Sequence, residues 1–324
     1  MPSKQILGLD IGGTKSAVVC GTAEGDILSR TEFPTEAGRP FQDYFQRLCE
    51  AISATLRSME DAPKAISVSI GGPLDVLQGI IMSPPNLPGW DNIPLKQLLK
   101  DKFNLPVYVE HDGNAGALAE YYFGAGKGKR SVVFLTLGTG LGAGLILDGR
   151  LYRGTSYVAG EIGHIRIADD GPESYGKKGS LEGYCSGNGI EKLASILFPK
   201  RWPDPVSTRE LGALARKGDA DAVEVFSTSG RYLGRGLAII ADLINPEMII
   251  LGALGVRMGP LMNLNLFLCL DTYGCERSVA TSRIMGGNLK LLSAGKITEI
   301  ASRILGLNSV WPKYKYPNIL DCAT

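Results

Sequence analysis

A glycine-rich segment between two apolar runs constrains the fold of this chain more than any other feature. It runs from Leu135 to Gly149, with glycine at positions 138, 140, 142 and 144. The pattern predicts a strand, a tight turn and a second strand. Glycine at these positions lets backbone N–H groups face a ligand and leaves no Cβ in its way. Taken alone, the segment would fit a plain hairpin with a glycine-rich turn equally well.

The same layout occurs near the start of the chain. The apolar stretch from Ile6 leads into Asp10-Ile-Gly-Gly-Thr-Lys15, and a second apolar run follows. Leu9 corresponds to Leu137, and Gly12 corresponds to Gly140. Two copies of strand, glycine turn and strand indicate two related halves that face each other across a cleft.

Composition excludes several classes of protein. A composition of 44% hydrophobic and 21% charged residues is typical of a globular protein. The length of 324 residues allows two domains or one large α/β unit. The formal net charge of +1, without a dense basic run, argues against binding of nucleic acid. No window reaches about 18 consecutive apolar residues, so no membrane-spanning helix is expected.

The N-terminal residues and the cysteines bear on localisation. No apolar targeting segment precedes the first predicted strand. The six cysteines form no C-x-x-C pair, so free thiols in a reducing cytoplasm are expected. We therefore expect a cytoplasmic protein.

Strands alternate with helices along the chain, which predicts an α/β fold. Apolar residues recur at helical spacing from Phe41 to Leu56, and further helices are predicted over 115–122, 220–243 and 297–305. Strands are predicted over 65–70, 107–110 and 248–251. We expect one domain to comprise residues 1–112 plus about 296–324, and a second to comprise residues 113–295.

The glycine turns differ from the common phosphate-binding motifs. The chain has no G-x-x-x-x-G-K-[ST] sequence, which excludes a P-loop. The glycines from 138 to 144 do not fit G-x-G-x-x-G, and a second strand rather than a helix follows, so a dinucleotide fold is not indicated. Two such hairpins suit a triphosphate held by amides and hydroxyls, with Asp10 binding Mg²⁺ directly or through water.

Five motifs together resemble the ROK family of bacterial sugar kinases and related repressors. They occur in the family's order: Leu9-Asp-x-Gly-Gly-Thr-Lys15, Glu110-His-Asp-Gly-Asn-Ala115, the turn at 137–144, Gly160-Glu-x-Gly-His164 and Leu181-Glu-Gly-Tyr184. The resemblance covers residues 5 to about 260. It implies two actin-like (ribonuclease H-like) domains around a central cleft.

The resemblance also implies a role for each motif. Asp112 would be the catalytic base, and the sugar would be bound by Gly72, Asn86, His111, Asp112, Glu161, His164 and Glu182. ATP would be the phosphate donor with Mg²⁺ at Asp10, and the nucleotide would contact Asp10, Gly12, Gly13, Thr14, Lys15, Gly138, Thr139, Gly140, Gly252 and Ala253.

The position of Asp112 supports its role independently. It lies between a predicted strand and a predicted helix, where the helix dipole favours an ionised carboxylate. Such a carboxylate can take a proton from a sugar hydroxyl as the oxygen attacks the γ-phosphoryl group. The alternative is that Asp112 only caps the helix, which is a common position for aspartate.

Three departures from the family pattern affect these expectations. His111 stands where the family usually has asparagine, which leaves the sugar preference open. Many relatives bind a structural zinc with three cysteines and the motif histidine, but here Glu173, Tyr175 and Ser180 occupy the cysteine positions. Only His164 remains of the four ligands, so no zinc site is expected, and we expect Tyr175 to pack where the metal would sit. The third departure is the atypical segment 296–302.

The resemblance implies an ATP-dependent hexose kinase, with the 6-hydroxyl of glucose as the first expected acceptor. Fructose, N-acetylglucosamine, N-acetylmannosamine and allose are alternative acceptors, and polyphosphate is an alternative donor. Repressors of the family carry a helix-turn-helix ahead of the first strand, and only five residues precede Ile6, so none is expected here. A catalytically silent sugar-binding protein is another alternative, which the intact Asp112 argues against. A homodimer is expected from the family.

Overall fold

The computed structural model describes residues 5–22, 24–259, 261–262 and 283–286. The described residues form two compact units, one from those within 1–136 and 142–161 and the other from those within 137–141 and 162–324. The predicted helix over 297–305 and the atypical segment 296–302 lie outside the described residues. The predicted domain boundary after Asp112, with the chain returning at about 296, therefore stays a prediction.

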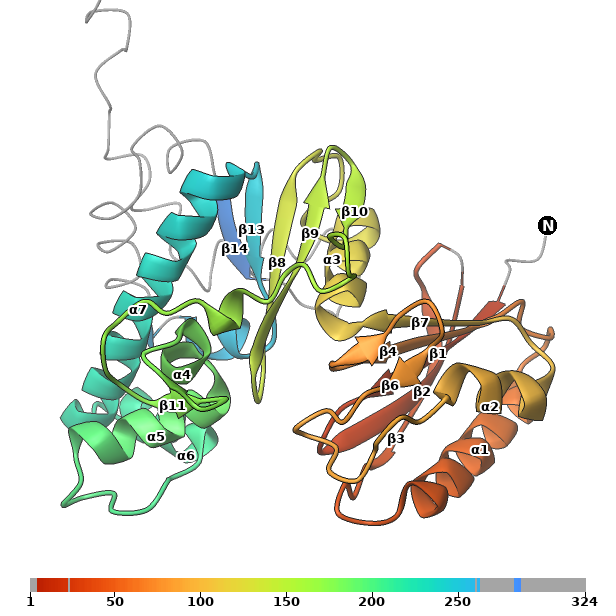
Figure 1. The fold of residues 1–324 in the computed structure, drawn as a ribbon, viewed down its shortest axis with the longest axis horizontal. Coiled ribbons are helices and arrows are strands. Elements are labelled where there is room, and N and C mark those ends of the chain that lie inside the picture. Colours follow the sequence, from red (N-terminus) through yellow and green to blue (C-terminus); the bar gives the residue numbers. More distant parts are fainter. Residues whose placement is uncertain (1–4, 23, 260, 263–282, 287–324) are drawn as a thin grey trace, which may run out of the picture. The chain divides into compact units, whose positions relative to one another are not determined.

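A five-stranded sheet organises the first unit (Figure 1). Its central strand pairs in antiparallel fashion on one side and in parallel fashion on the other, so that Leu9 lies beside both Val18 and Val68. The strands follow the order β3 (Ile27–Pro34), β2 (Lys15–Thr22), β1 (Gln5–Ile11), β4 (Ile66–Ile70) and β7 (Val107–His111). Strands β1, β4 and β7 are parallel and end at the same edge, where the polar motif residues begin.

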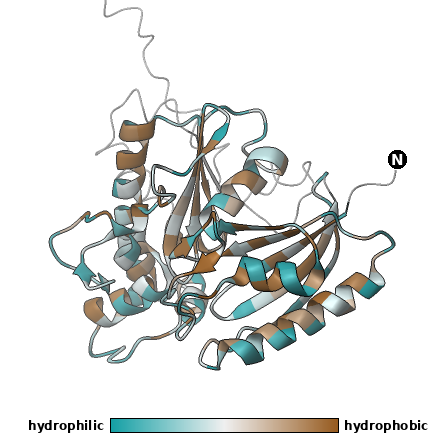
Figure 2. Ribbon diagram, turned by 45° about the vertical axis from the view of Figure 1, so that its right-hand side comes forward, coloured by the Kyte–Doolittle hydropathy of each residue, from teal (hydrophilic) through white to brown (hydrophobic). Residues whose placement is uncertain are grey.

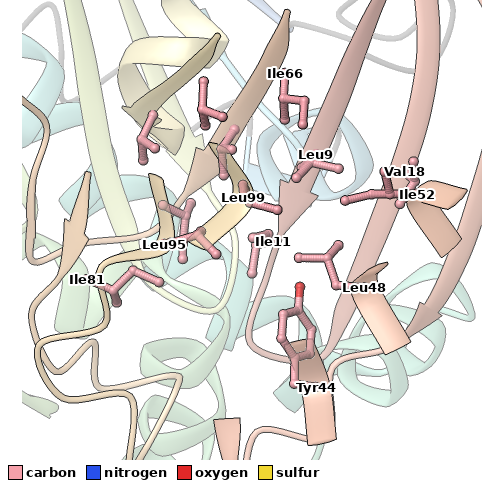
Figure 3. Close-up of a cluster of buried hydrophobic side chains, with 14 of the residues drawn as sticks. Leu9, Ile11, Val18, Tyr44, Leu48, Ile52, Ile66, Ile81, Leu95 and Leu99 are labelled. Carbon is pink, nitrogen blue, oxygen red and sulfur yellow. The ribbon is translucent and has the colours of Figure 1, made fainter. Parts of the chain in front are cut away.

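One face of this sheet is covered by α1 (Phe41–Ser58) and α2 (Leu95–Phe103) (Figure 1). On β1, alternate residues point into this core, and Leu7, Leu9 and Ile11 are at most 2% exposed. Figure 3 shows side chains from the strands and both helices meeting in the cluster. Hydrophobic colour follows the strands in Figure 2, whereas α1 and α2 also carry hydrophilic residues. Burial of this core fixes where each strand ends.

The first unit continues through α3 (Asp112–Phe123), β8 (Val132–Leu137), β9 (Leu141–Leu147) and β10 (Arg150–Tyr152). It also holds a small hairpin of β5 (Leu74–Asp75) and β6 (Ile80–Ile81). The prediction of a helix starting at Ala115 was wrong, because α3 begins at Asp112. Gly113 is a poor helix former, which hid this start, and tertiary packing overrides that preference.

Three glycines around Ala143 join α3, β9 and the segment before Glu161. A Cβ on Gly113 would lie 2.8 Å from the Ala143 carbonyl oxygen, and one on Gly160 would lie 2.2 Å from the same atom. A Cβ on Gly144 would lie 2.2 Å from the Gly113 carbonyl oxygen. The backbones touch here, so the residues next to these glycines are drawn together.

The described part of the second unit is mainly helical and also contains a parallel strand pair and a short antiparallel hairpin. The confirmed long helix is α7 (Ala220–Ile244), which ends at Asn245 in the left-handed conformation, one residue before Pro246. The strand after it, β13 (Met248–Leu251), pairs with β14 (Arg283–Gly286). The shorter elements are η1 (Ile162–His164), β11 (Glu173–Ser174), β12 (Lys177–Lys178), α4 (Leu181–Cys185), α5 (Gly187–Leu197) and α6 (Thr208–Arg216).

Two further expectations can be compared with the described part of the chain. None of its helices is long and apolar enough to cross a membrane. Cys20, Cys49 and Cys185 are buried free thiols. Burial raises the pKa of each of these thiols, which favours an unreactive neutral form.

Candidate functional site

The first glycine turn joins β1 to β2, and a buried chain of hydroxyl groups is hydrogen-bonded to its backbone. The Thr35 hydroxyl donates to the Gly12 carbonyl oxygen at 2.6 Å and lies 2.9 Å from the Ser16 hydroxyl. The Tyr44 hydroxyl donates to Ser16 at 2.8 Å. The side chains of Tyr44, Ser16 and Thr35 are at most 1% exposed. Burial raises the pKa of Tyr44 far above its ordinary value, so it stays a neutral donor.

Asn86 lies directly against this turn. A Cβ on Gly13 would meet the Asn86 carbonyl oxygen at 2.8 Å and its Cβ at 2.9 Å, so only glycine fits there. The structure thus brings a residue expected to line the sugar pocket into contact with a residue expected to hold phosphate. Such a contact suits phosphoryl transfer, because the acceptor hydroxyl and the donor phosphate must be held close together.

Asp10 and Lys15 lie at the two ends of the turn. The Asp10 carboxylate is 3.6 Å from the Arg30 guanidinium, and the side chain is 60% exposed. Desolvation raises the pKa of Asp10, Arg30 lowers it, and the like charge of Asp112 raises it, with a net upward shift. The Lys15 side chain is exposed and lies 3.8 Å from Glu32.

Asp112 is the first residue of α3, directly after β7. The N–H of Gly113 donates to the Asp112 carboxylate at 2.7 Å, and it lies 3.4 Å from Nδ1 of His111. The alternative that Asp112 only caps the helix was wrong, because the N-cap of α3 is His111, whose ring accepts from the Gly113 N–H, and Asp112 is already the first helical residue. With 41% of its side chain exposed, the carboxylate also keeps access for a ligand.

His111 contacts three other residues that were expected in the site. Its Nδ1 is 3.1 Å from the Asp112 carboxylate, and its Nε2 accepts from the Gly72 N–H at 3.1 Å. The Glu161 carboxylate lies 4.0 Å from Nε2. A neutral ring with its proton on Nδ1 satisfies both close partners, because Nε2 then keeps a lone pair for Gly72.

The carboxylates near His111 favour the protonated ring instead. Burial lowers the pKa of His111, but the hydrogen bond and charge of Asp112, with the charges of Glu161 and Glu110, outweigh burial and raise it above 6.5. Protonation of Nε2 would remove the acceptor of the Gly72 N–H. The carboxylates therefore favour the charged ring, whereas the Gly72 N–H favours the neutral one.

Glu110 fixes the junction between β7 and α3. Its carboxylate accepts two hydrogen bonds from Arg153, at 2.9 and 2.6 Å, and one from the Asn114 amide at 2.9 Å. It also accepts from the His111 N–H at 3.1 Å. Both Arg153 nitrogens donate to Oε2, and the Asn114 amide and His111 N–H donate to Oε1, so both carboxylate oxygens are held in place. The motif residues Glu110 and Asn114 therefore serve structure, next to the residue expected to act chemically.

The second glycine turn joins β8 to β9 at residues 138–140. The first amides of α5 bind it: the Gly187 N–H donates to the Gly138 carbonyl oxygen at 2.8 Å, and the Asn188 N–H donates to that of Thr139 at 3.3 Å. The turn closes on itself through a bond from the Gly138 N–H to the Gly140 carbonyl oxygen, at 3.0 Å. A helix N-terminus therefore adjoins the turn expected to hold phosphate.

Glu182 and His164 occupy the same unit as this turn. The buried Glu182 carboxylate accepts from the Leu141 N–H at 2.8 Å and from the Ser174 hydroxyl. The His164 ring is stacked on that of Tyr175, with centroids 4.8 Å apart and planes at 21°. Tyr175 therefore packs on the histidine, and the expectation that it occupies the place of the metal stays a prediction. Gly252 and Ala253 follow β13, and Ala253 has a φ of 37°.

Few side chains in the described residues could serve together as ligands for a metal ion. The described residues contain no cluster of three or more histidine, cysteine or acidic side chains. Asp10, at the end of the first glycine turn, is a single carboxylate. This fits Mg²⁺, which takes one or two carboxylates and keeps water and phosphate as its other ligands.

The structure gathers the expected residues in two sets. In the first unit, Gly72, His111, Asp112 and Glu161 form one contact group, and the first glycine turn meets Asn86. In the second unit, Glu182 accepts from the N–H of Leu141, the residue that follows the second glycine turn. Sequence reasoning missed the supports of these groups, which are Ser16, Thr35, Tyr44, Arg153 and Ser174.

The chain is similar in sequence to known proteins of one family. A model of the ROK family matches residues 6–265. A glucokinase from Streptomyces coelicolor is 35% identical over 262 residues, covering 76% of this chain and 80% of the relative.

Solved structures include both functional branches of that family. A ROK family glucokinase from Streptomyces griseus, in complex with glucose and AMPPNP, matches with a TM-score of 0.76 and 30% identity, over 92% of this chain and 98% of the other. A ROK family transcriptional regulator, a homologue of the E. coli MLC protein, matches with a TM-score of 0.78 and 25% identity, over 95% and 81%.

Proposed function

This chain belongs to the ROK family and shares its actin-like α/β fold, and from this premise we propose that it is an ATP-dependent sugar kinase. The proposed reaction transfers the γ-phosphoryl group of ATP to a hexose, with the 6-hydroxyl of glucose as the first acceptor to test. The observation that carries the proposal is Asp112, an exposed carboxylate at a helix start, held next to His111, whose other ring nitrogen lies 4.0 Å from Glu161.

Each proposed step uses a group described above. The sugar hydroxyls bind Glu161, His164 and Glu182, whose carboxylate oxygens and ring nitrogens can form hydrogen bonds with hydroxyl groups. Asp112 takes the proton of the attacking hydroxyl as the oxygen–phosphorus bond forms. The proton ends on the carboxylate, and ADP leaves with the electrons of the broken bond.

The glycine turns hold the phosphates in this proposal. The Gly12 and Gly138 N–H groups close the two turns by donating to the Lys15 and Gly140 carbonyl oxygens, so the amides of residues 13–14 and 139–140 bind phosphate oxygens. The N-terminal end of α5 adds a favourable dipole next to the second turn. Asp10 would hold Mg²⁺, which neutralises phosphate charge when bound. Gly252 and Ala253 border the adenosine.

A coupled ADP-release assay tests the proposal. Purified protein is given ATP and Mg²⁺ with glucose, fructose, allose, N-acetylglucosamine or N-acetylmannosamine in turn, and polyphosphate replaces ATP in a parallel series. We expect ADP release to depend on sugar and to be fastest with glucose. Absence of sugar-dependent turnover with every acceptor and both donors would contradict the proposed activity.

The likeness to a transcriptional regulator supports one second candidate, a sugar-binding protein without catalysis. His111 in place of the family's usual asparagine is the residue that favours it. Calorimetry separates the two functions, because the second candidate binds sugar with measurable heat but releases no ADP.

A further inference from the structure

A short hairpin in the second unit contacts both of the residues there that we propose to bind sugar. It consists of β11 and β12, and its turn is formed by Tyr175 and Gly176. Ser174 contacts Glu182, and Tyr175 contacts His164. Two consecutive hairpin residues thus reach two separate sugar-binding candidates.

The contact of Ser174 completes the support of the Glu182 carboxylate. One carboxylate oxygen accepts from the backbone N–H of Leu141 at 2.8 Å, and the other accepts from the Ser174 hydroxyl. Glu182 is only 7% exposed, so both bonds lie in a protein environment where hydrogen bonds to a charged group are strong. A carboxylate held at both oxygens has one orientation and still has lone pairs for a ligand.

The contact of Tyr175 acts on the ring of His164. The two rings are nearly parallel, and their spacing is typical of offset stacking. Tyr175 has a φ of 50° and Gly176 one of 69°, as in a type I′ turn. This conformation is uncommon for an aromatic residue. Stacking on His164 offers a reason why a tyrosine occupies it.

The hairpin is itself attached to the helix that supports the second glycine turn. The ammonium group of Lys192, on α5, donates to the Glu173 carbonyl oxygen at 2.7 Å. The first amides of the same helix bind the carbonyls of Gly138 and Thr139. Hairpin, helix and glycine turn therefore form one connected framework within this unit.

We propose that Ser174 and Tyr175 are positioning residues for sugar binding: Ser174 orients the Glu182 carboxylate, and Tyr175 orients the His164 imidazole. This inference rests on the proposed function, because it assumes that Glu182 and His164 bind the sugar. It assigns the hairpin a role in sugar affinity and none in the transfer step.

Kinetics give the first test. Ser174→Ala should raise the KM for sugar by about 5- to 20-fold, as expected for the loss of one hydrogen bond to a charged group. It should leave the KM for ATP within about 2-fold. Ser174→Thr keeps the hydroxyl and should restore most of the affinity. Lys177→Ala, an exposed residue of the same hairpin, is the matched control and should behave like the wild type.

The histidine signals give a second test that needs no catalysis. The chain has two histidines, so the imidazole region of an NMR spectrum of untagged protein should hold two sets of signals. His111→Gln assigns them. Tyr175→Leu should move the His164 Hε1 signal downfield, because it removes the ring current of the stacked tyrosine, and should leave His111 unchanged. Tyr175→Phe keeps the ring and should leave both signals in place.

The outcomes separate failure of the inference from failure of the function. An active wild type whose sugar KM is unchanged in Ser174→Ala, or whose His164 signal is unmoved in Tyr175→Leu, overturns the inference alone. No turnover, with sugar affinity by calorimetry that still falls in Ser174→Ala, refutes the kinase and supports the positioning role. A wild type that binds no sugar refutes both.

Discussion

At the scale of single residues, Asp112 combines two roles that a carboxylate at a helix start can have. It accepts the Gly113 N–H, which stabilises α3, and it keeps 41% of its side chain exposed. Asp112→Asn keeps the shape and an oxygen that can accept the Gly113 N–H, but it removes the proton acceptor. We expect kcat to fall about 10²- to 10⁴-fold, the usual loss for a general base.

The control for this variant is its melting temperature, which should stay near that of the wild type because the N-cap His111 is unchanged and the amide oxygen can still accept the Gly113 N–H. A folded Asp112→Asn protein with nearly normal kcat would show that another group accepts the proton.

His111 should make the stability of the protein depend on pH. Its folded pKa lies above 6.5, so the folded state favours the protonated ring. The stabilisation is therefore fully present below the unfolded pKa of about 6.5 and is lost as pH rises through the folded value. The difference in unfolding free energy between wild type and His111→Asn should be most favourable to the wild type at about pH 5.5 and decline toward about pH 8.5.

Urea denaturation of both proteins across this pH range measures the difference. A difference that does not change with pH, or that grows toward alkaline pH, would mean that the carboxylates do not favour the charged ring.

At the scale of elements, the first glycine turn depends on a hydroxyl chain that begins on a helix. Thr35→Val removes the donor to the Gly12 carbonyl oxygen and the partner of Ser16 while keeping the side-chain shape. Two buried polar groups then lose a partner, which should lower the unfolding free energy by about 1–3 kcal/mol. The KM for ATP should rise, since the turn loses its support, and the KM for sugar should change less.

The matched control is Thr55→Val in α1. The Thr55 hydroxyl is also buried, but it donates to the Ala51 carbonyl oxygen of its own helix, which already lies in the helical hydrogen-bond series. Urea denaturation should give a smaller loss for this variant. Equal losses in both proteins would indicate a general effect of removing a buried hydroxyl rather than support of the turn.

Sequence patterns predicted the strands, helices and glycine turns better than the side-chain hydrogen bonds that join them. The turns at Gly12 and Gly138 were predictable because their glycines and flanking apolar runs are local in sequence. The hydroxyls of Ser16 and Tyr44 are 28 positions apart, and Glu110 and Arg153 are 43 positions apart. Such pairs follow no periodic pattern, so only the folded chain reveals them.

At the scale of the whole molecule, the confirmed α/β fold follows from alternating strands and helices. The assignment of site residues to substrate and cofactor stays a prediction, since patterns identify residue types but not bound ligands. The expected absence of a zinc site is the clearest example of such a prediction. Relatives with the cysteine motif have thiolates where this chain has Glu173, Tyr175 and Ser180. We expect the protein to fold and work without zinc.

Elemental analysis of protein purified without added metal tests this expectation, together with activity before and after EDTA and after excess Mg²⁺. Mg²⁺ alone should restore activity. Stoichiometric zinc, or activity that returns only with zinc, would show that the hairpin does not replace the metal.

The glycine contacts around Ala143 also limit how this protein can vary in evolution. Gly113 follows Asp112, and Gly160 precedes Glu161, so each glycine adjoins a residue of the proposed site. Neither has room for a Cβ beside the backbone at Ala143. Random substitution at Gly113, Gly144 or Gly160 should therefore be rejected by selection about as strongly as substitution of Asp112 itself. Lineages that change their sugar preference must do so through side chains elsewhere, while this backbone contact stays fixed.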